Sequence, residues 1–464
     1  MNAKRALAIA LSAVSILGLL LLPGSVLTPM VAEALPGGLD ITFGRNGLIQ
    51  ETFGGSDQAN AVAIQSDGKI VVAGSSVNNG ERFALARYES RGFLDFFSFG
   101  TGGKVVTDFP GFPDVVASDV AIQPDAKIVV VGTANANSSL ADFALARYNS
   151  NGTLDTTFGT CLLPGACTGT QLTDFGIIRA PADVARAVAL QPDGKIVVAG
   201  GNVEDVELAR YTRDGNLDPT FGQGGKAIVN FRLGFEEAVD VVLQGDGKIV
   251  TAVRLQQFIP GQRLDHDFAV ARFEADGRPD TTFGTGGITW FRTASDEEAR
   301  SVALQLDGKI VAAGRTTSTR TRPDFVVARF DTNGLLDTTF GAGTGVVTTD
   351  FGGPDEATGV AVVAFPVFPG PRIGQKIVVV GWSRIDLTAF AVARYNLDGT
   401  LDADFGLGGK TTNAWIGGAD LAAHAVAVGP PNRSIVLVGV SATIPVAPGS
   451  SVNQDFAVAR FLWQ

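Results

Sequence analysis

Charged residues are scarce in this chain of 464 residues, at 18% of the total, against about 25% in ordinary soluble proteins. Basic residues are fewer than acidic ones, with 36 Lys and Arg against 47 Asp and Glu. The formal net charge is -11. A surface that binds nucleic-acid phosphates needs an excess of Lys and Arg. We therefore expect no nucleic-acid partner.

Residues of conventional catalysis are also few, with two histidines and two cysteines. The chain has no G-x-S-x-G, H-E-x-x-H, P-loop or D-x-D-x-D-G string, which would indicate a hydrolase nucleophile, a zinc site, a phosphate cradle or a calcium loop. His266 and His424 lie in different repeats. The sequence therefore predicts no catalytic residues, no metal ligands and no cofactor.

The first 34 residues have the pattern of an export signal. Lys4 and Arg5 precede an uncharged stretch over 6–22, and Ala32-Glu33-Ala34 offers the small-x-small pattern of a cleavage site. We expect residues 1–34 to be a signal peptide and residues 35–464 to be secreted, periplasmic or on the cell surface, without a membrane span. An uncleaved membrane anchor remains the alternative.

Cys161 and Cys167 interrupt an otherwise regular pattern, in TCLLPGACTGT. Their C-x5-C spacing is not that of a zinc or thioredoxin motif. In an oxidising compartment it favours a local disulfide, and two free thiols remain the alternative.

One repeated unit organises the rest of the chain. An LD-x-x-FG element and an Ala-Arg-aromatic element each occur seven times, with arginine-to-arginine spacings of 57 to 66 residues. The LD elements begin at Leu39, Leu94, Leu154, Leu217, Pro279, Leu336 and Leu401, and the arginines are Arg87, Arg147, Arg210, Arg272, Arg329, Arg394 and Arg460. A period of this length is typical of propellers and solenoids.

Each unit reads as four short strands, which the second copy illustrates with strands over 104–109, 119–123, 127–132 and 143–148. Asp-Gly joins the middle two strands in copies one, three, four and five, as in a tight hairpin. The other copies have Asp125-Ala126, a long Pro-rich segment over 365–375, and residues 429–434.

Seven such units predict an all-β, seven-bladed propeller, with an open solenoid as the alternative. Six of the arginines precede the Asp of the next LD element by eight residues, whereas Arg460 has no downstream Asp and Asp40 has no upstream Arg. Arg460 and Asp40 can pair with each other if residues 39–53 supply the missing fourth strand of the last blade. We expect the ring to close in this way and every arginine to pair with an LD aspartate.

The combination of LD-x-x-FG, Q-x-DGKIVVAG and DFALARY resembles the delta-60 repeat beta-propellers of secreted bacterial proteins. The resemblance extends from Leu39 to Phe461. It implies the propeller fold and export, and it implies no reaction, substrate or active site.

The residues that change within constant surroundings are the candidates for function. Each crossing into an innermost strand is acidic and ends in an Ala followed by a variable residue, and we expect these positions to surround the mouth of the central channel. The predicted ligand-binding residues are Asn60, Ser118, Arg186, Arg300, Thr358 and His424, together with Asp296 and Glu297. The arginines would bind an anion or the carboxylates a cation, while an ordinary solvated pore mouth is the alternative.

The sequence thus favours a secreted binding module over an enzyme, with an unknown protein, glycan or small molecule as its partner. We expect a monomer. An extracellular hydrolase or lyase with a channel-mouth site and a cell-surface structural protein remain the alternatives.

Overall fold

The computed structural model describes residues 36–463 except 79, 137–139, 164–165, 177–181, 203, 258–265, 293–294, 318–321, 368–371, 414–419, 430–433 and 443–453. The predicted signal peptide lies outside these residues, as do parts of the variable loops. No helix within the described part of the chain is long and apolar enough to cross a membrane. The secondary structure there is β-strand, with one short 3-10 helix, η1 (Gly341–Gly343).

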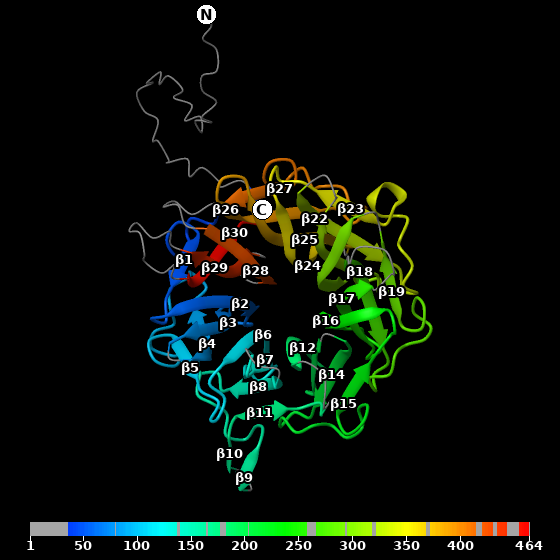
Figure 1. The fold of residues 1–464 in the computed structure, drawn as a ribbon. Helices are drawn as coiled ribbons and strands as arrows, with labels where there is room; N and C mark the ends of the chain where they lie inside the picture. The colour runs from blue at the N-terminus through cyan, green and yellow to red at the C-terminus, as the bar shows by residue number, and fades with distance from the viewer. Residues whose placement is uncertain are drawn as a thin grey trace, which may run out of the picture. The chain divides into compact units, whose positions relative to one another are not determined.

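The strands form seven antiparallel four-stranded sheets arranged as the blades of a ring, which confirms the predicted propeller (Figure 1). Each innermost strand contacts the innermost strands of both neighbouring blades. The innermost strands are β2 (Ser56–Ile64), β6 (Val115–Ile122), β12 (Val184–Leu190), β16 (Gly234–Leu243), β20 (Asp296–Leu304), β24 (Asp355–Val367) and β28 (Asp420–Gly429). The second strands are β3 (Ile70–Val77), β7 (Ile128–Ala134), β13 (Ile196–Gly201), β17 (Ile249–Gln257), β21 (Ile310–Thr317), β25 (Arg372–Arg384) and β29 (Ser434–Ala442).

The third strands carry the Ala-Arg-aromatic element, and the outer strands follow the LD element. The third strands are β4 (Glu81–Tyr88), β8 (Asp142–Tyr148), β14 (Val206–Tyr211), β18 (His266–Phe273), β22 (Pro323–Phe330), β26 (Thr388–Tyr395) and β30 (Gln454–Phe461). The outer strands are β5 (Lys104–Thr107), β11 (Thr170–Thr173), β15 (Lys226–Val229), β19 (Ile288–Phe291), β23 (Val346–Thr349), β27 (Lys410–Asn413) and β1 (Leu48–Glu51). A sequence repeat therefore begins with the outer strand of one blade and continues into the next blade.

The ring closes through the N-terminal strand, as predicted. Strand β1 pairs antiparallel with β30, so that Leu48 lies opposite Ala459 and Glu51 opposite Phe456. Asp40 forms the closing ion pair with Arg460 at 2.8 Å. The last blade thus contains strands from both ends of the described chain.

The innermost strands are longer than the sequence predicts. In the second blade we expected residues 119–123, but β6 begins at Val115. Every innermost strand is interrupted by a β-bulge directly after the repeated alanine, for example between Ala117 and Asp119. A bulge reverses the alternation of inward and outward side chains, which is why the first half of each strand has the sequence of a polar loop.

A hydrophobic core lies between each pair of neighbouring blades. Seven separate clusters of buried Val, Ala, Phe, Ile and Leu side chains span the seven blade-to-blade contacts. Each blade is therefore stabilised by its two neighbours rather than by a core of its own.

The repeated arginines link one blade to the next. Arg147 is buried, forms an ion pair with Asp155 at 2.7 Å and lies over the ring of Phe158 at 4.6 Å. Its Nη1 also donates to the carbonyl oxygen of Arg213 in the following blade. All seven arginines pair with an LD aspartate in this way, which confirms the prediction.

Two further sets of repeated polar residues make side-chain contacts. In six blades the lysine directly before the second strand, or at its equivalent in β25, binds the LD aspartate, as Lys127 binds Asp155 at 2.7 Å. The tyrosine hydroxyl also contributes in three of the four blades that have one. Tyr148, for example, lies 2.7 Å from Thr107 on the outer strand of the preceding blade.

The predicted disulfide between Cys161 and Cys167 is present. It joins β9 (Cys161–Leu163) to β10 (Ala166–Cys167), a small two-stranded ribbon inserted between β8 and β11. The ribbon projects from the second blade, outside its four-stranded sheet (Figure 1).

Candidate functional site

The seven variable residues of the innermost strands are the bulge residues themselves. Each lies at the register shift of its strand: Asn60, Ser118, Arg186, Val239, Arg300, Thr358 and His424. They therefore occupy equivalent places on the seven blades, as the repeat alignment predicts. A bulge residue has no direct partner in the ladder, so its side chain is free to take a different role in each blade.

Three of these side chains bind the main chain of the next blade. Asn60 Nδ2 donates to the carbonyl oxygen of Ala117 at 2.7 Å, and Thr358 Oγ1 donates to that of Ala423 at 2.9 Å. His424 Nδ1 lies 2.8 Å from the carbonyl oxygen of Ala59. Burial, partly offset by this contact, lowers the pKa of His424, so the imidazole is neutral at pH 7 and Nδ1 is the donor.

The two bulge arginines belong to a network of charges along blades three to six. Arg186 Nε binds Glu237 Oε1 at 2.6 Å, and Glu237 also binds Arg254. Arg300 Nη2 lies 3.2 Å from Glu298 and 3.0 Å from Glu356 on the next blade. We call this set the arginine arc: Arg186, Arg254, Arg300 and Arg315 with Glu237, Glu298 and Glu356.

Glu237 and Glu298 of the arc are buried and Glu356 is partly exposed, whereas the arginines are more exposed than all three. Glu298 contacts three arginines, which are Arg300, Arg254 and Arg315. The Arg315 Nη2 atom lies 3.0 Å from its carboxylate. The arginine side chains are between 25% and 40% exposed, with Arg315 and Arg186 at the two limits. Four guanidinium groups thus contact three glutamates, and Arg315 also lies 3.7 Å from Asp296. The partly exposed side of the arc presents the four guanidinium groups.

The arc covers only part of the ring. The position two residues before the bulge is Glu237, Glu298 or Glu356 in blades four to six, whereas blades seven, one and two have Ala422, Gln58 and Val116. At this position the ring therefore carries glutamates on blades four to six and uncharged residues on blades seven, one and two. A purely structural pore mouth gives no reason for such a division.

Asp296 and Glu297 were predicted to belong to the same acidic rim, and the structure separates their environments. Asp296 Oδ1 accepts from the His266 backbone N–H at 2.7 Å and lies 2.9 Å from His266 Nδ1. Burial alone would raise the pKa of Asp296, but these bonds and the charges of His266 and Arg315 hold it below the usual value. Glu297 is buried, and Thr316 Oγ1 donates to it at 3.4 Å.

Most of the remaining acidic crossing residues are not rim groups, contrary to our expectation. Four of them accept backbone N–H groups of the preceding loop: Asp57 from Phe53, Asp183 from Phe175, Glu236 from Phe231 and Asp355 from Phe351. All four are buried. They fix the path by which the chain crosses from one blade to the next.

The residue pattern did not indicate two further carboxylates near the ring's centre, those of Asp119 and Asp240. Asp119 Oδ2 accepts the N–H of Val188 at 2.8 Å, and Asp240 Oδ2 accepts that of Val302 at 2.8 Å. Each residue directly follows its bulge. Burial raises the pKa of Asp119 to about 7. The charge of Asp240 raises this pKa further, whereas the hydrogen bond from the Val188 N–H lowers it. The register shift that turns these side chains inward is invisible in the residue pattern.

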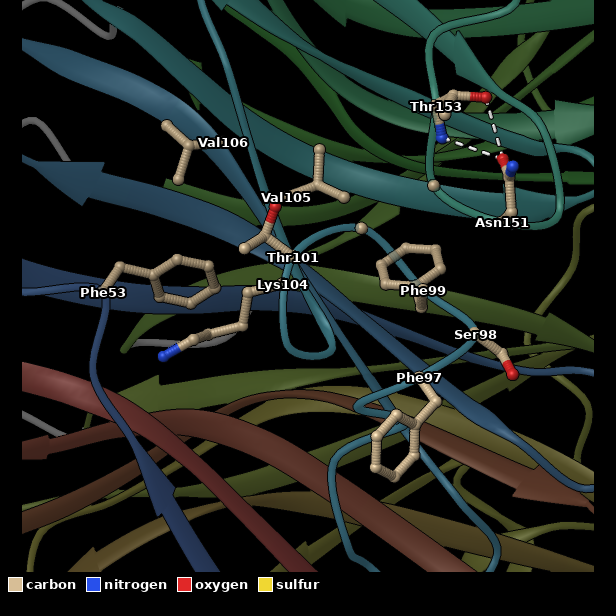
Figure 2. A pocket seen from close by; sticks show the side chains of 12 residues that line it. Phe53, Phe97, Ser98, Phe99, Thr101, Lys104, Val105, Val106, Asn151 and Thr153 are labelled. Atoms are coloured by element: carbon tan, nitrogen blue, oxygen red, sulfur yellow. Dashed lines mark hydrogen bonds between the residues drawn. The ribbon is translucent and has the colours of Figure 1, made fainter.

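A separate pocket of about 710 Å³ lies at the outer edge of the first blade (Figure 2). Phe53, Phe97, Phe99 and Lys104 are among the side chains that line it, and Phe97 is 96% exposed. Phe97 stands in the LDFFSFG copy, which has one residue more than the other LD elements.

Comparisons with known proteins agree with the propeller architecture. Residues 65–95, 123–158, 191–221, 265–283, 305–340 and 376–405 match a family described as a domain of unknown function (DUF5122) beta-propeller. No curated protein matches the chain in sequence.

Solved structures are similar in fold at low sequence identity. Semaphorin 2a from Drosophila is 9% identical over 93% of this chain and 76% of its own, with a TM-score of 0.51. A virginiamycin B lyase from Staphylococcus aureus is 9% identical over 89% of this chain and 98% of its own, with a TM-score of 0.46. An ulvan lyase is 10% identical over 88% of this chain and 95% of its own, with a TM-score of 0.47. This chain is a seven-bladed β-propeller whose repeats match the DUF5122 beta-propeller family in six segments.

Proposed function

We propose that the protein is an exported propeller of the delta-60 repeat type that binds an anionic ligand at the arginine arc. The observation that carries the proposal is the row of four partly exposed guanidinium groups, held by less exposed glutamates, along blades three to six. Arg presents a rigid fork of donors that suits carboxylate and sulfate groups. Because the glutamates already hold the arginines in place, little side-chain entropy is lost on binding.

Export is supported by the signal-like N-terminal sequence and by the Cys161–Cys167 disulfide, since disulfides persist in oxidising compartments. Ligands in such a location that carry carboxylate or sulfate include acidic glycans and small organic acids. The partner in this proposal is therefore a glycan or small molecule with these groups.

The test is calorimetric titration of the full chain with sulfated oligosaccharides, uronate oligosaccharides and small dicarboxylates at low and high salt. We expect one class to bind, and Arg186→Ala with Arg300→Ala to weaken its binding at least tenfold. The fold should survive, because Glu237 keeps Arg254 and Glu298 keeps Arg315 as partners. Arg213→Ala is the matched control, since Arg213 is an exposed arginine paired with Asp125 outside the arc.

Binding that is unchanged in the double variant, or the absence of any binding across the panel, would refute the proposal. Cleavage of a bound oligosaccharide during the titration would instead identify the arc as part of an enzyme site.

A further inference from the structure

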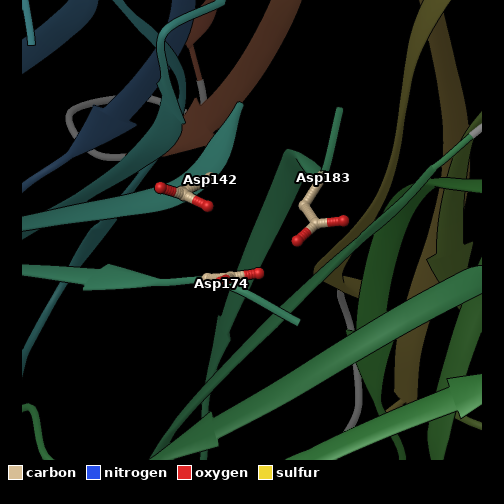
Figure 3. Close-up of side chains that lie close together, drawn as sticks. All are labelled: Asp142, Asp174 and Asp183. Atoms are coloured by element: carbon tan, nitrogen blue, oxygen red, sulfur yellow. The ribbon is translucent and has the colours of Figure 1, made fainter. Parts of the chain in front are cut away.

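Two groups of three aspartates lie at equivalent places in the repeat, away from the arginine arc. Asp142, Asp174 and Asp183 come together where the second blade meets the third, and Asp324, Asp350 and Asp355 where the fifth meets the sixth. In each group the first residue stands at or beside the start of the third strand, the second directly follows the outer strand, and the third lies at the crossing into the next blade. Figure 3 shows the carboxylates of the first group directed around one common space.

Their geometry is that of ligands around one ion. Within each group, one carboxylate oxygen from each residue lies within 4.8 Å of the others. Two oxygens that bind opposite sides of a Ca²⁺ ion, at about 2.4 Å each, are separated by about 4.8 Å. Three separate backbone segments supply the oxygens, which suits a cation that accepts irregular coordination.

A fourth carboxylate points to a missing positive charge in the first group. Glu207 is 0% exposed and faces Asp183, and its Oε2 has no hydrogen-bond donor among the described residues. The other six blades have Ala or Val at this position, for example Ala144 and Val326. Two buried carboxylates that face one another require a proton or a cation between them.

The second group has a similar feature. Asp355 is 0% exposed, its Oδ2 accepts the Phe351 N–H, and beyond the Ser383 hydroxyl its Oδ1 has no donor among the described residues. The nearby lysines do not donate hydrogen bonds to these carboxylates. Lys226 donates to the main-chain oxygen of Asp174, and Lys410 donates to that of Asp350.

Other blades supply a cation from their own side chains at the same place. In the first blade Arg82 replaces the first aspartate and binds Asp108 at 2.7 Å. In the fourth blade Arg292 replaces the second aspartate and lies 3.4 Å from Asp267. The two all-aspartate groups lack this internal guanidinium.

We propose that each group binds one Ca²⁺ ion between neighbouring blades. Ca²⁺ takes six to eight oxygen ligands and tolerates irregular geometry, whereas Mg²⁺ requires near-octahedral coordination. The aspartates would bind the ion directly, and in the first group Glu207 would face the same charge through Asp183. Each ion would join the outer part of one blade to the crossing into the next.

The test is calorimetric titration of the chelator-treated full chain with CaCl₂, with MgCl₂ titrated in parallel. We expect two Ca²⁺ ions per chain, one in Asp174→Asn, one in Asp350→Asn and none in the double variant. Asp174 and Asp350 are exposed, so these variants should fold. Asp108→Asn is the matched control, because Asp108 has the same repeat position but pairs with Arg82, and it should keep both sites.

Three results would overturn the proposal: no Ca²⁺ binding, Ca²⁺ binding that both variants retain in full, or Mg²⁺ binding as tight as that of Ca²⁺. Thermal unfolding gives an independent readout, since ligands that bind only the folded state raise its stability. The unfolding temperature should rise with CaCl₂ in the wild type and in Asp108→Asn, and should not rise in the double variant.

Discussion

A single arginine position makes a polar contact between neighbouring blades in every repeat. In each repeat the guanidinium contacts an aspartate, the ring of the FG phenylalanine and a main-chain oxygen of the following blade, as Arg272 does with Asp280, Phe283 and Thr332. Removal of one partner from a buried ion pair commonly costs about 3–5 kcal/mol. The same residue therefore recurs wherever a blade must be attached to the next.

Ala126 carries a local strain that a glycine would relieve. Four other blades have Gly at this hairpin position, and Ala126 adopts the same left-handed backbone, with φ of 64° against 87° for Gly194. A side chain with Cβ disfavours this conformation. We predict that Ala126→Gly raises the free energy of unfolding by about 0.5–1 kcal/mol, measured by urea denaturation.

The converse variant supplies the control. A Cβ on Gly194 would meet no atom closer than 3.5 Å, so Gly194→Ala tests backbone conformation alone. It should destabilise the protein by a similar amount. Destabilisation by Ala126→Gly would show that backbone strain does not limit the stability of this turn.

At the scale of single elements, the sequence predicts the strands better than it predicts their inner halves. The second strands of the blades are continuous buried runs, such as residues 128–134 in β7, and were located to within a few residues. The innermost strand of the second blade begins four residues earlier than predicted, because the bulge after Ala117 reverses the alternation that reveals a strand. The candidate site shares this difficulty.

Repeat alignment identified the seven bulge positions, but it could not identify their partners. Arg254 and Arg315 of the arginine arc lie on second strands and differ from the residues at equivalent places in other blades. The aspartate groups combine three segments of two neighbouring blades. Such contacts depend on how blades meet, which the order of residues within one repeat does not record.

The contact between the second and third blades should make stability depend on pH through Glu207. Burial, together with the charge of Asp183, raises the pKa of Glu207 to about 9. Between its ordinary pKa near 4.5 and about 9, the folded protein holds a proton that the unfolded chain has released. The free energy of unfolding therefore falls as the pH rises through this range.

We predict that Glu207→Gln removes this dependence. In the presence of a chelator, the stability of the variant relative to the wild type should increase by up to about 1.4 kcal/mol per pH unit between pH 5 and 9. Urea denaturation at several pH values measures the difference, in which contributions from carboxyl groups that do not contact Glu207 cancel. Glu204→Gln, an exposed change on the same blade, should run parallel to the wild type. A constant difference between Glu207→Gln and wild type would mean that Glu207 titrates normally.

At the scale of the whole molecule, the ring depends on a joint that is not covalent. The other six blades are each formed by one continuous stretch of chain, whereas the last blade combines β28, β29 and β30 with β1. Around this joint, the N–H of Gly37 donates to Leu462 O at 2.9 Å and that of Leu462 to Gly38 O at 2.9 Å. Residues 36–38 and 462–463 therefore lie side by side, in the place where the other blades have a turn between their third and outer strands.

This arrangement predicts that the ring tolerates new chain termini at another position. A circular permutant that begins at residue 55 and carries residues 36–54 after Gln464, joined by a short Gly-Ser linker, retains β1, its pairing with β30 and the Asp40–Arg460 ion pair. Its free energy of unfolding should lie within about 1–2 kcal/mol of the wild type, because only a loop connection changes. A matched chain of residues 55–464 lacks the closing strand, leaves Arg460 without Asp40 and should unfold at a markedly lower temperature. Equal unfolding temperatures for this truncated chain and the permutant would show that the N-terminal strand does not hold the ring closed.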